Sequence, residues 1–152
     1  MNLLNFSQNQ KTFALTIINI EKMKKKDFNI ANAPSPVGAY PHSKKVGNFL
    51  FLSGIGSRNS SDNSIPDNFE EECHSVFKNI RNVIKESGAK WEDLVDVTVF
   101  LTNMSRDFDT FNKLYEKYFK EINPCRTTVE VKSLPTPISI ELKCIAYIGK
   151  HI

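Results

Sequence analysis

Two residues in the C-terminal third of the chain could act together on a small acid. Arg126 lies in the segment 124–131, where it opens an apparent strand, and Glu141 lies in the segment 139–143, inside the next apparent strand. An arginine side chain presents a planar fork of donors that fits a carboxylate bidentately. A glutamate in a strand can hold or activate a water molecule. The pair therefore suggests hydrolysis of a small carboxylated molecule, on which the two side chains would converge from neighbouring strands.

Each of these residues also has an ordinary structural explanation. Taken alone, Arg126 is better explained by an ion pair at a strand edge. Strand alternation places Glu141 on the polar side of its strand, so a solvated face explains it equally well. Tyr40 would serve turn packing, and Ser53 would cap a strand end. The functional interpretation gains weight only when these residues are considered together.

Other chemistries find little support in the sequence. The chain has no glycine-rich phosphate loop before a helix, and its three cysteines lack metal-ligand spacing. The segment Gly54-Ile55-Gly56 precedes a polar loop instead of a dinucleotide-binding helix. The histidines His42, His74 and His151 are scattered, and we expect His74 at the boundary of a helix surface. No bound metal or cofactor is therefore expected.

The elements that must position the candidate residues follow the order β-β-α-β-α-β-β. Asp67 can cap a helix that runs to about Ser87, and Gly88 is placed to end it. A second helix is expected over residues 108–119. The expected strands cover residues 43–46, 48–54, 94–102, 127–132 and 138–147. Alternation places Val95, Val97, Val99 and Leu101 on one face of the strand at 94–102, and Ile138, Ile140, Leu142 and Cys144 on one face of the last strand.

This order predicts an α+β protein with a mixed β-sheet and two helices on one face. The other face of the sheet would be left bare, although its strands carry apolar side chains. A second subunit is the expected cover, with closed symmetry as the usual outcome. The length of 152 residues favours one domain. We divide the chain into an N-terminal extension, residues 1–27, poorly ordered or peripheral, and a single domain over residues 28–152.

Charge and cysteine content limit the partners and the compartment. The extension holds five lysines against two acidic residues, and the rest of the chain is balanced. Nucleic acid is therefore not an expected partner. No apolar run reaches the length of a membrane span, so no membrane is expected either. An odd cysteine count without a clear signal peptide favours the cytoplasm.

The extension itself leaves several possibilities open. Residues 12–20 form a short apolar run that could be an extra edge strand or a targeting segment. In the second case a mitochondrion or another organelle would replace the cytoplasm. A start of translation at Met23 is a further possibility.

Five segments in a fixed order resemble the Rid family (reactive intermediate deaminase A, also called YjgF or L-PSP). The resemblance covers about residues 30–149, and the segments around Arg126 and Glu141 are its specific part. The matching segments are Gly38-Ala39-Tyr40, Leu52-Ser53-Gly54, Val97-Thr98-Val99-Phe100-Leu101, Pro124-Cys125-Arg126 and Ile140-Glu141-Leu142-Lys143-Cys144-Ile145-Ala146.

This resemblance implies a chorismate-mutase-like fold and a homotrimer around a central β-barrel, with sites in the clefts between subunits. The arginine matching Arg126 grips the substrate carboxylate, and the glutamate matching Glu141 positions the water. Residues that match the family's pocket lining are Tyr40, Ser53 and Gly54, with Asn112 near the cleft.

The chain departs from the common Rid pattern two residues after the arginine. Many relatives have a cysteine there, and this chain has Thr128. The backbone of Thr128 can still contact substrate, but a reactive thiol is not expected at this position. Cys125 is not a substitute for it.

The implied function is cofactor-independent hydrolytic deamination. Reactive imine or enamine acids such as 2-iminobutanoate or 2-iminopropanoate would become 2-keto acids and ammonia. Residues 40–47, the pair Ser57-Arg58 and residues 126–129 further resemble the 2-aminomuconate deaminase branch, so that activity is a second possible function. An L-PSP-type endoribonuclease is a third, and a non-catalytic protein that binds small acids or acts as a holdase is a fourth.

Overall fold

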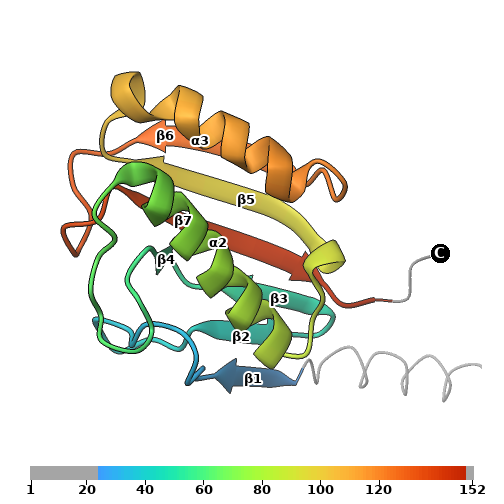
Figure 1. Ribbon diagram of the computed structural model, residues 1–152. Helices are drawn as coiled ribbons and strands as arrows, with labels where there is room; N and C mark the ends of the chain where they lie inside the picture. Colours follow the sequence, from blue (N-terminus) through green and yellow to red (C-terminus); the bar gives the residue numbers. More distant parts are fainter. Residues whose placement is uncertain (1–23, 150–152) are drawn as a thin grey trace, which may run out of the picture.

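The structure, a computed structural model, describes residues 24–149 as one mixed sheet with two helices (Figure 1). The expected α+β class is confirmed. Its elements are β1 Lys25–Phe28, β2 Ser43–Val46, β3 Phe49–Leu52, β4 Ile55–Gly56, α2 Phe69–Glu86, a 3₁₀ turn Trp91–Asp93, β5 Leu94–Leu101, α3 Met104–Phe119, β6 Cys125–Glu130 and β7 Ile140–Tyr147.

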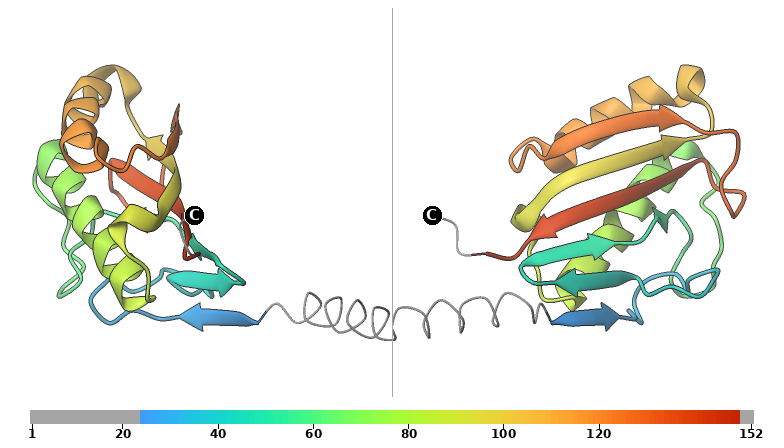
Figure 2. Two further views of the ribbon diagram at one scale, coloured as in Figure 1. Left: turned by 90° about the vertical axis from the view of Figure 1, so that its right-hand side faces the viewer. Right: turned by 180° about the vertical axis from the view of Figure 1, so that it is seen from behind.

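The sheet runs in the order β1-β2-β3-β7-β5-β6, and β4 also pairs with β7. Only β5 and β6 are parallel among these pairs; the others are antiparallel. Both helices lie on the same face of the sheet, and the view from behind shows the opposite face without a helix (Figure 2). That bare face exposes large apolar side chains, namely Phe49, Phe51, Val95 and Val129.

Helix α2 forms where the spacing of apolar residues predicts it. Its cap is Asn68, one residue after the expected Asp67, and the Asn68 Oδ1 accepts a hydrogen bond from the Glu71 amide at 3.0 Å. The buried face carries Val76, Phe77 and other apolar side chains at intervals of three and four. Gly88 ends this region with a φ of 83°, a conformation that glycine adopts without strain.

Helix α3 begins earlier than expected, at Met104 instead of residue 108. Asn103 caps it, because the Asn103 Oδ1 accepts a hydrogen bond from the Arg106 amide at 3.0 Å. The Glu130 carboxylate, at the end of β6, accepts a second bond from the Met104 amide. Polar caps therefore add a turn that the apolar periodicity alone does not reveal.

Strand β5 corrects the expectation that Val95 shares a face with Val97, Val99 and Leu101. The last three share one face, which is fully buried, but Val95 is 41% exposed. The register against β7 shifts between Leu94 and Asp96, so that Val95 is the extra residue of a bulge. The bulge brings Leu94 into the core in its place. In β7 the expected alternation is confirmed, with Ile140, Leu142 and Cys144 buried.

A second bulge separates β3 from β4. Phe51 pairs with Ile145 and Ile55 pairs with Leu142, so four steps along one strand face three along the other. The extra residue falls at Ser53 and Gly54. Bulges of this kind re-aim side chains and interrupt pairing next to functional sites. Here the interruption lies against Glu141.

The N-terminal region contributes an edge strand. Lys25, Lys26 and Asp27, which we assigned to the extension, form most of β1 and pair with β2. Their side chains are exposed. The remaining expectations for residues 1–23, including the apolar run at 12–20 and the start at Met23, lie outside the described residues, as does His151. Among residues 24–149, no helix has the length and apolar character needed to cross a membrane.

Candidate active site

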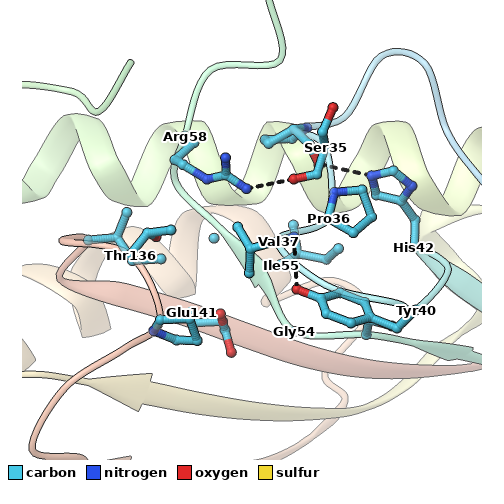
Figure 3. Close-up of a pocket in the computed structure, with 15 residues that line it drawn as sticks. Ser35, Pro36, Val37, Tyr40, His42, Gly54, Ile55, Arg58, Thr136 and Glu141 are labelled. Carbon is cyan, nitrogen blue, oxygen red and sulfur yellow. Dashed lines mark hydrogen bonds between the residues drawn. The ribbon is translucent and has the colours of Figure 1, made fainter. Parts of the chain in front are cut away.

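Three segments that are far apart in the sequence enclose a cavity of about 40 Å³ (Figure 3). They are the proline-rich lead-in before β2, the bulge region from Ser53 to Arg58, and the link before β7. A single water needs only about 10–15 Å³, so the space admits more than one. The cavity is lined by Pro34, Ser35, Pro36, Val37, Tyr40, His42, Ser53, Gly54, Ile55, Gly56, Arg58, Pro135, Thr136, Ile138 and Glu141.

Glu141 is the acidic group of this cavity. Its side chain is half-buried, and it makes no hydrogen bond or ion pair with any described residue. Burial raises the pKa of the Glu141 carboxyl above its ordinary value, because a desolvated carboxylate loses its hydration. A partly buried carboxyl that lacks a partner and titrates closer to neutrality suits proton transfer better than structural bonding.

Gly54 makes room for this carboxylate. A Cβ atom added at Gly54 would lie 2.7 Å from the Glu141 Cδ and would overlap its Oε1. The backbone of Gly54 does not need a positive φ, so the requirement is space and not conformation. The glycine is therefore needed here because the Glu141 side chain lies directly over its Cα.

Tyr40 and Ser53 line the same cavity as Glu141, as the resemblance implies. The Ser53 Oγ donates to the Pro41 carbonyl at 2.6 Å, so the hydroxyl ties the bulge to the lead-in. The Tyr40 side chain is 41% exposed, and its hydroxyl accepts a weak bond from the Val37 amide at 3.3 Å. Tyr40 thus forms an open rim of the cavity, whereas Ser53 holds its wall.

His42 also lines the cavity, but both of its ring nitrogens are occupied. Its Nδ1 accepts a hydrogen bond from the Ile30 amide at 2.9 Å, which leaves Nε2 as the donor to the Pro34 carbonyl, also at 2.9 Å. These bonds require a neutral ring with its proton on Nε2. The buried histidine therefore braces the lead-in and is not available as a general base.

Arg58 is the cation of the cavity, and the sequence assigned it no site role beyond a branch motif. Its guanidinium donates to the Ser35 carbonyl at 2.7 Å and to the Asn63 Oδ1 at 2.9 Å. It makes no ion pair with a carboxylate among residues 24–149. Figure 3 shows Arg58 and Glu141 on different walls of the cavity. We call Tyr40, Ser53, Gly54, Arg58 and Glu141 the glutamate half-site.

Arg126 lies elsewhere, against helix α3. Its guanidinium carbon is 4.7 Å from the centre of the Tyr115 ring, and its Nη1 donates to the Asn112 Oδ1 at 2.9 Å. The ion pair that would explain Arg126 as a structural residue is not formed with any described carboxylate. Within residues 24–149 the remaining donors of the fork have no hydrogen-bond partner, so they are free for an anion. We call Asn112, Tyr115, Arg126 and Thr128 the arginine half-site.

Thr128 and Cys125 follow the alternation of β6. Thr128 shares the helix-covered face with Arg126 and is half-buried, and its Oγ1 has no hydrogen-bond partner among the described residues. Cys125 is exposed on the opposite face. The thiol therefore points away from the guanidinium, which agrees with the expectation that Cys125 does not replace the family cysteine.

One chain does not bring the two half-sites together. The strands of Arg126 and Glu141 are consecutive in the sequence but are not neighbours, because β5 lies between β6 and β7. Arg126 pairs with the buried Val97, whereas Glu141 pairs with Phe100 on the opposite face. The two side chains thus project from opposite faces of the sheet. The expected convergence on one small acid does not occur within the chain.

Metal chemistry gains no support from the geometry. Within residues 24–149, no group of three histidine, cysteine or acidic side chains could hold a metal ion. Cys73 and Cys144 are buried, and burial raises the pKa of both thiols well above the ordinary range. Neither is therefore a reactive thiolate at neutral pH.

Comparisons with known proteins agree with the fold. The family model described as "Endoribonuclease L-PSP" matches residues 30–148. Reactive Intermediate Deaminase A, chloroplastic, of Arabidopsis thaliana is 32% identical over 147 residues, which cover 96% of this chain and 78% of that protein. A RutC family protein of Aquifex aeolicus is 35% identical over 123 residues, covering 80% and 98%.

The fold comparison gives the same answer. The crystal structure of RidA from an Antarctic Psychrobacter superposes with a TM-score of 0.77 at 30% identity, covering 81% of this chain and 99% of that one. The chain therefore belongs to the Rid (YjgF, L-PSP) family, as its sequence motifs indicate. Its chorismate-mutase-like sheet with two helices on one face is the fold of that family.

Proposed function

We propose that this protein hydrolyses reactive imine or enamine acids to 2-keto acids and ammonia, at sites that two subunits complete. The carrying observation is a pair of charged groups that have no ionic partner among residues 24–149: the half-buried Glu141, and the Arg126 guanidinium, which donates a hydrogen bond to Asn112. The relative named Reactive Intermediate Deaminase A supports the reaction class. Because one chain keeps these groups on opposite faces of the sheet, a neighbouring copy must supply one of them.

The chemistry needs little beyond positioning. Arg126 of one subunit would bind the substrate carboxylate and orient the C=N carbon. Glu141 of the neighbour would take a proton from water while the water oxygen bonds to the carbon of the protonated imine, which gives a neutral tetrahedral carbinolamine. Glu141 would then pass that proton to the nitrogen. As the C–N bond breaks, Glu141 would take the hydroxyl proton, so that ammonia leaves and the keto acid forms. The raised pKa of Glu141 favours both halves of this transfer.

An oligomer would also account for the bare sheet face. Phe49 and Phe51 are 44% and 39% exposed there, and Phe49 lies 5.2 Å from the Tyr147 ring. An apolar patch of this kind marks an interaction surface. We propose a homotrimer whose sheets face a common centre, so that β6 at the sheet edge lies beside the next subunit.

A subunit-mixing experiment tests this proposal. The Arg126→Ala and Glu141→Ala chains are each expected to be inactive on 2-iminobutanoate generated in situ and followed with a trapping amine. When equal amounts of the two chains are refolded together into a closed ring, about a quarter of the interfaces should contain both wild-type groups. The mixture should therefore recover about a quarter of the wild-type activity. Native mass spectrometry should show that oligomers containing both chains have formed. If such a mixture is as inactive as each variant alone, the proposal that two subunits complete each site is refuted.

A second candidate function, close to 2-aminomuconate deaminase, is favoured by Arg58. This second cation shares the cavity with Glu141 and lacks a carboxylate partner among residues 24–149. It would bind a second acidic group of the substrate. We expect Arg58→Ala to raise KM about tenfold for the imine of a dicarboxylic acid, with less than about a twofold change for 2-iminobutanoate. Equal effects on both substrates would remove this candidate.

A further inference from the structure

A buried carboxylate on α2 joins the two strands that hold Glu141. Glu72 is only 5% exposed, and its Oε2 accepts hydrogen bonds from the Ser57 Oγ at 2.6 Å and from the Ser139 amide at 2.8 Å. A buried charge is tolerated only when such donors satisfy it. We call this pair of bonds the Glu72 bridge.

The two donors of the Glu72 bridge flank the position of Glu141. Ser57 follows Gly56, and Gly56 is the register partner of Glu141 across β4 and β7. Ser139 lies directly before β7, two residues ahead of Glu141. One carboxylate oxygen therefore fastens the outer ends of both strands at the point where their pairing places the half-buried glutamate.

Strand β4 needs such support because it is only two residues long. A strand of that length gains too few ladder bonds to persist alone. A second buried side chain of α2 assists, since the Asn79 Nδ2 donates to the carbonyls of Gly56 at 2.9 Å and Arg58 at 2.8 Å. Helix α2 thus holds β4 with side chains, where the rest of the sheet relies on backbone pairing.

We infer that Glu72 is a positioning residue that fixes Glu141 through β4, a role that rests on the proposed function. Glu72 does not line the cavity and does not touch the substrate's space. Its loss would free the end of β4, let water reach the far side of the Glu141 carboxylate, and spread that carboxylate over several positions. Binding of the substrate carboxylate by Arg126, which lies on the edge strand β6, would be unaffected.

Kinetics of Glu72→Ala separate positioning from stability. We expect kcat to fall about tenfold or more, because misplacement of a reacting group by about 1 Å is costly, while KM changes less than about twofold. The acidic limb of the kcat/KM profile should move to lower pH as Glu141 becomes better hydrated. Glu72→Gln should restore both kcat and the position of the limb, since its amide oxygen still accepts from Ser57 and Ser139. Partial unfolding of the variant would lower kcat/KM at every pH and would not shift the acidic limb of the profile.

Two further variants serve as control and as safeguard. Glu70→Ala removes an exposed carboxylate from the same helical turn and should match wild type. Ser57→Ala removes one of the two bonds and should give a smaller shift in the same direction, even if Glu72→Ala does not fold. The other ionisable groups beside Glu141, namely Tyr40, His42, Lys44, Arg58 and Lys143, stay unchanged in every variant.

Amide hydrogen exchange distinguishes this inference from the proposed function. In Glu72→Ala and Ser57→Ala, exchange should accelerate at β4 and the start of β7 and remain unchanged in β6 and α3. A wild type that turns over no imine sinks the proposed function but leaves the support of β4 by Glu72 intact. Unaltered exchange at β4, or a Glu72→Gln protein as impaired as Glu72→Ala, would overturn the inference.

Discussion

The two half-sites are built by different means. The arginine half-site stands on regular elements: Arg126 lies over the ring of Tyr115, and Tyr115 stacks on Phe119 one turn further along α3 at 4.0 Å. The glutamate half-site stands on irregular backbone, with a bulge, a two-residue strand and two proline-containing segments. The arginine half-site presents a guanidinium on a rigid support. The glutamate half-site encloses a small cavity around a partly desolvated carboxylate.

This difference predicts how each half-site responds to mutation. Substitutions of Asn112 and Arg126, the two exposed members of the arginine half-site, should change substrate binding and leave folding almost unaffected. In the glutamate half-site the same side chains define the cavity and pack its walls, so that catalysis and stability should change together, in opposite directions for some variants. Substitutions at four positions of the two half-sites test this contrast, beginning with the largest expected effect.

Arg126→Ala should reduce kcat/KM roughly 10³-fold, the loss of two charge-assisted hydrogen bonds. Arg126→Lys should recover only part of this loss, because a lysine cannot bind bidentately. The melting temperature should match wild type, since Arg126 is exposed. The matched control is Arg81→Ala, which removes an exposed arginine of α2 whose guanidinium lies over the Trp91 ring. This variant should retain full activity. If Arg126→Ala and Arg81→Ala both lose activity while they remain folded, the overall positive charge of the protein, and not the Arg126 guanidinium, binds the substrate.

Glu141→Gln should lower kcat about 10²- to 10⁴-fold, the usual contribution of a general acid–base group. It should also make the protein more stable at neutral pH. Because burial raises the pKa of Glu141, its contribution to stability is complete below the unfolded-state pKa and is lost as pH rises through the folded-state pKa. The unfolding free energies of wild type and variant, measured by chemical denaturation, should therefore be similar at acidic pH. They should differ at pH values above the folded-state pKa of Glu141. A variant less stable than wild type at pH 7 would contradict this assignment.

Gly54→Ala should lower kcat about tenfold or more, because the new methyl group displaces the Glu141 carboxylate. Gly88→Ala is the complementary control: nothing lies within 4 Å of the added Cβ, but its φ of 83° is strained for alanine. That variant should lose about 1 kcal/mol of unfolding free energy and keep its kcat. Steady-state kinetics and chemical denaturation of both proteins make the comparison.

Tyr115 should give the smallest effect. Burial raises the pKa of its hydroxyl, which has no hydrogen-bond partner among the described residues. Tyr115→Phe removes that unsatisfied group and keeps the ring, so KM and stability should be equal to or better than wild type. Tyr115→Leu removes the aromatic face beneath Arg126 and should raise KM about two- to fivefold. Equal KM values for the two variants would show that the ring does not hold the guanidinium.

The regular parts of this molecule could be predicted from the sequence. Intervals of three and four located α2, and alternation placed Glu141 opposite the buried Leu142. Gly88 ended its helix as expected. These features depend on side-chain patterns, which periodicity measures directly.

The irregular parts could not be predicted in the same way. The bulges at Val95 and at Ser53 carry no residue pattern of their own, because they depend on pairing with a distant strand. The polar strand β1 gave no apolar signal. The order β7-β5-β6, which separates Arg126 from Glu141, is a matter of topology that strand patterns do not contain. Arg58 was visible only as part of a motif, since its place in the cavity depends on the second bulge.

The extra residue between β3 and β4 has a consequence for how this site could be lost. Deletion of Ser53 or Gly54 would let β3 and β4 join in one unbroken strand, with Leu52 and Ile55 still directed toward the helices. Such a shortened chain would have a more regular sheet and no recess beside Glu141. A single in-frame codon loss at this point would therefore remove the recess that the proposed reaction requires, whereas most single substitutions would leave it in place.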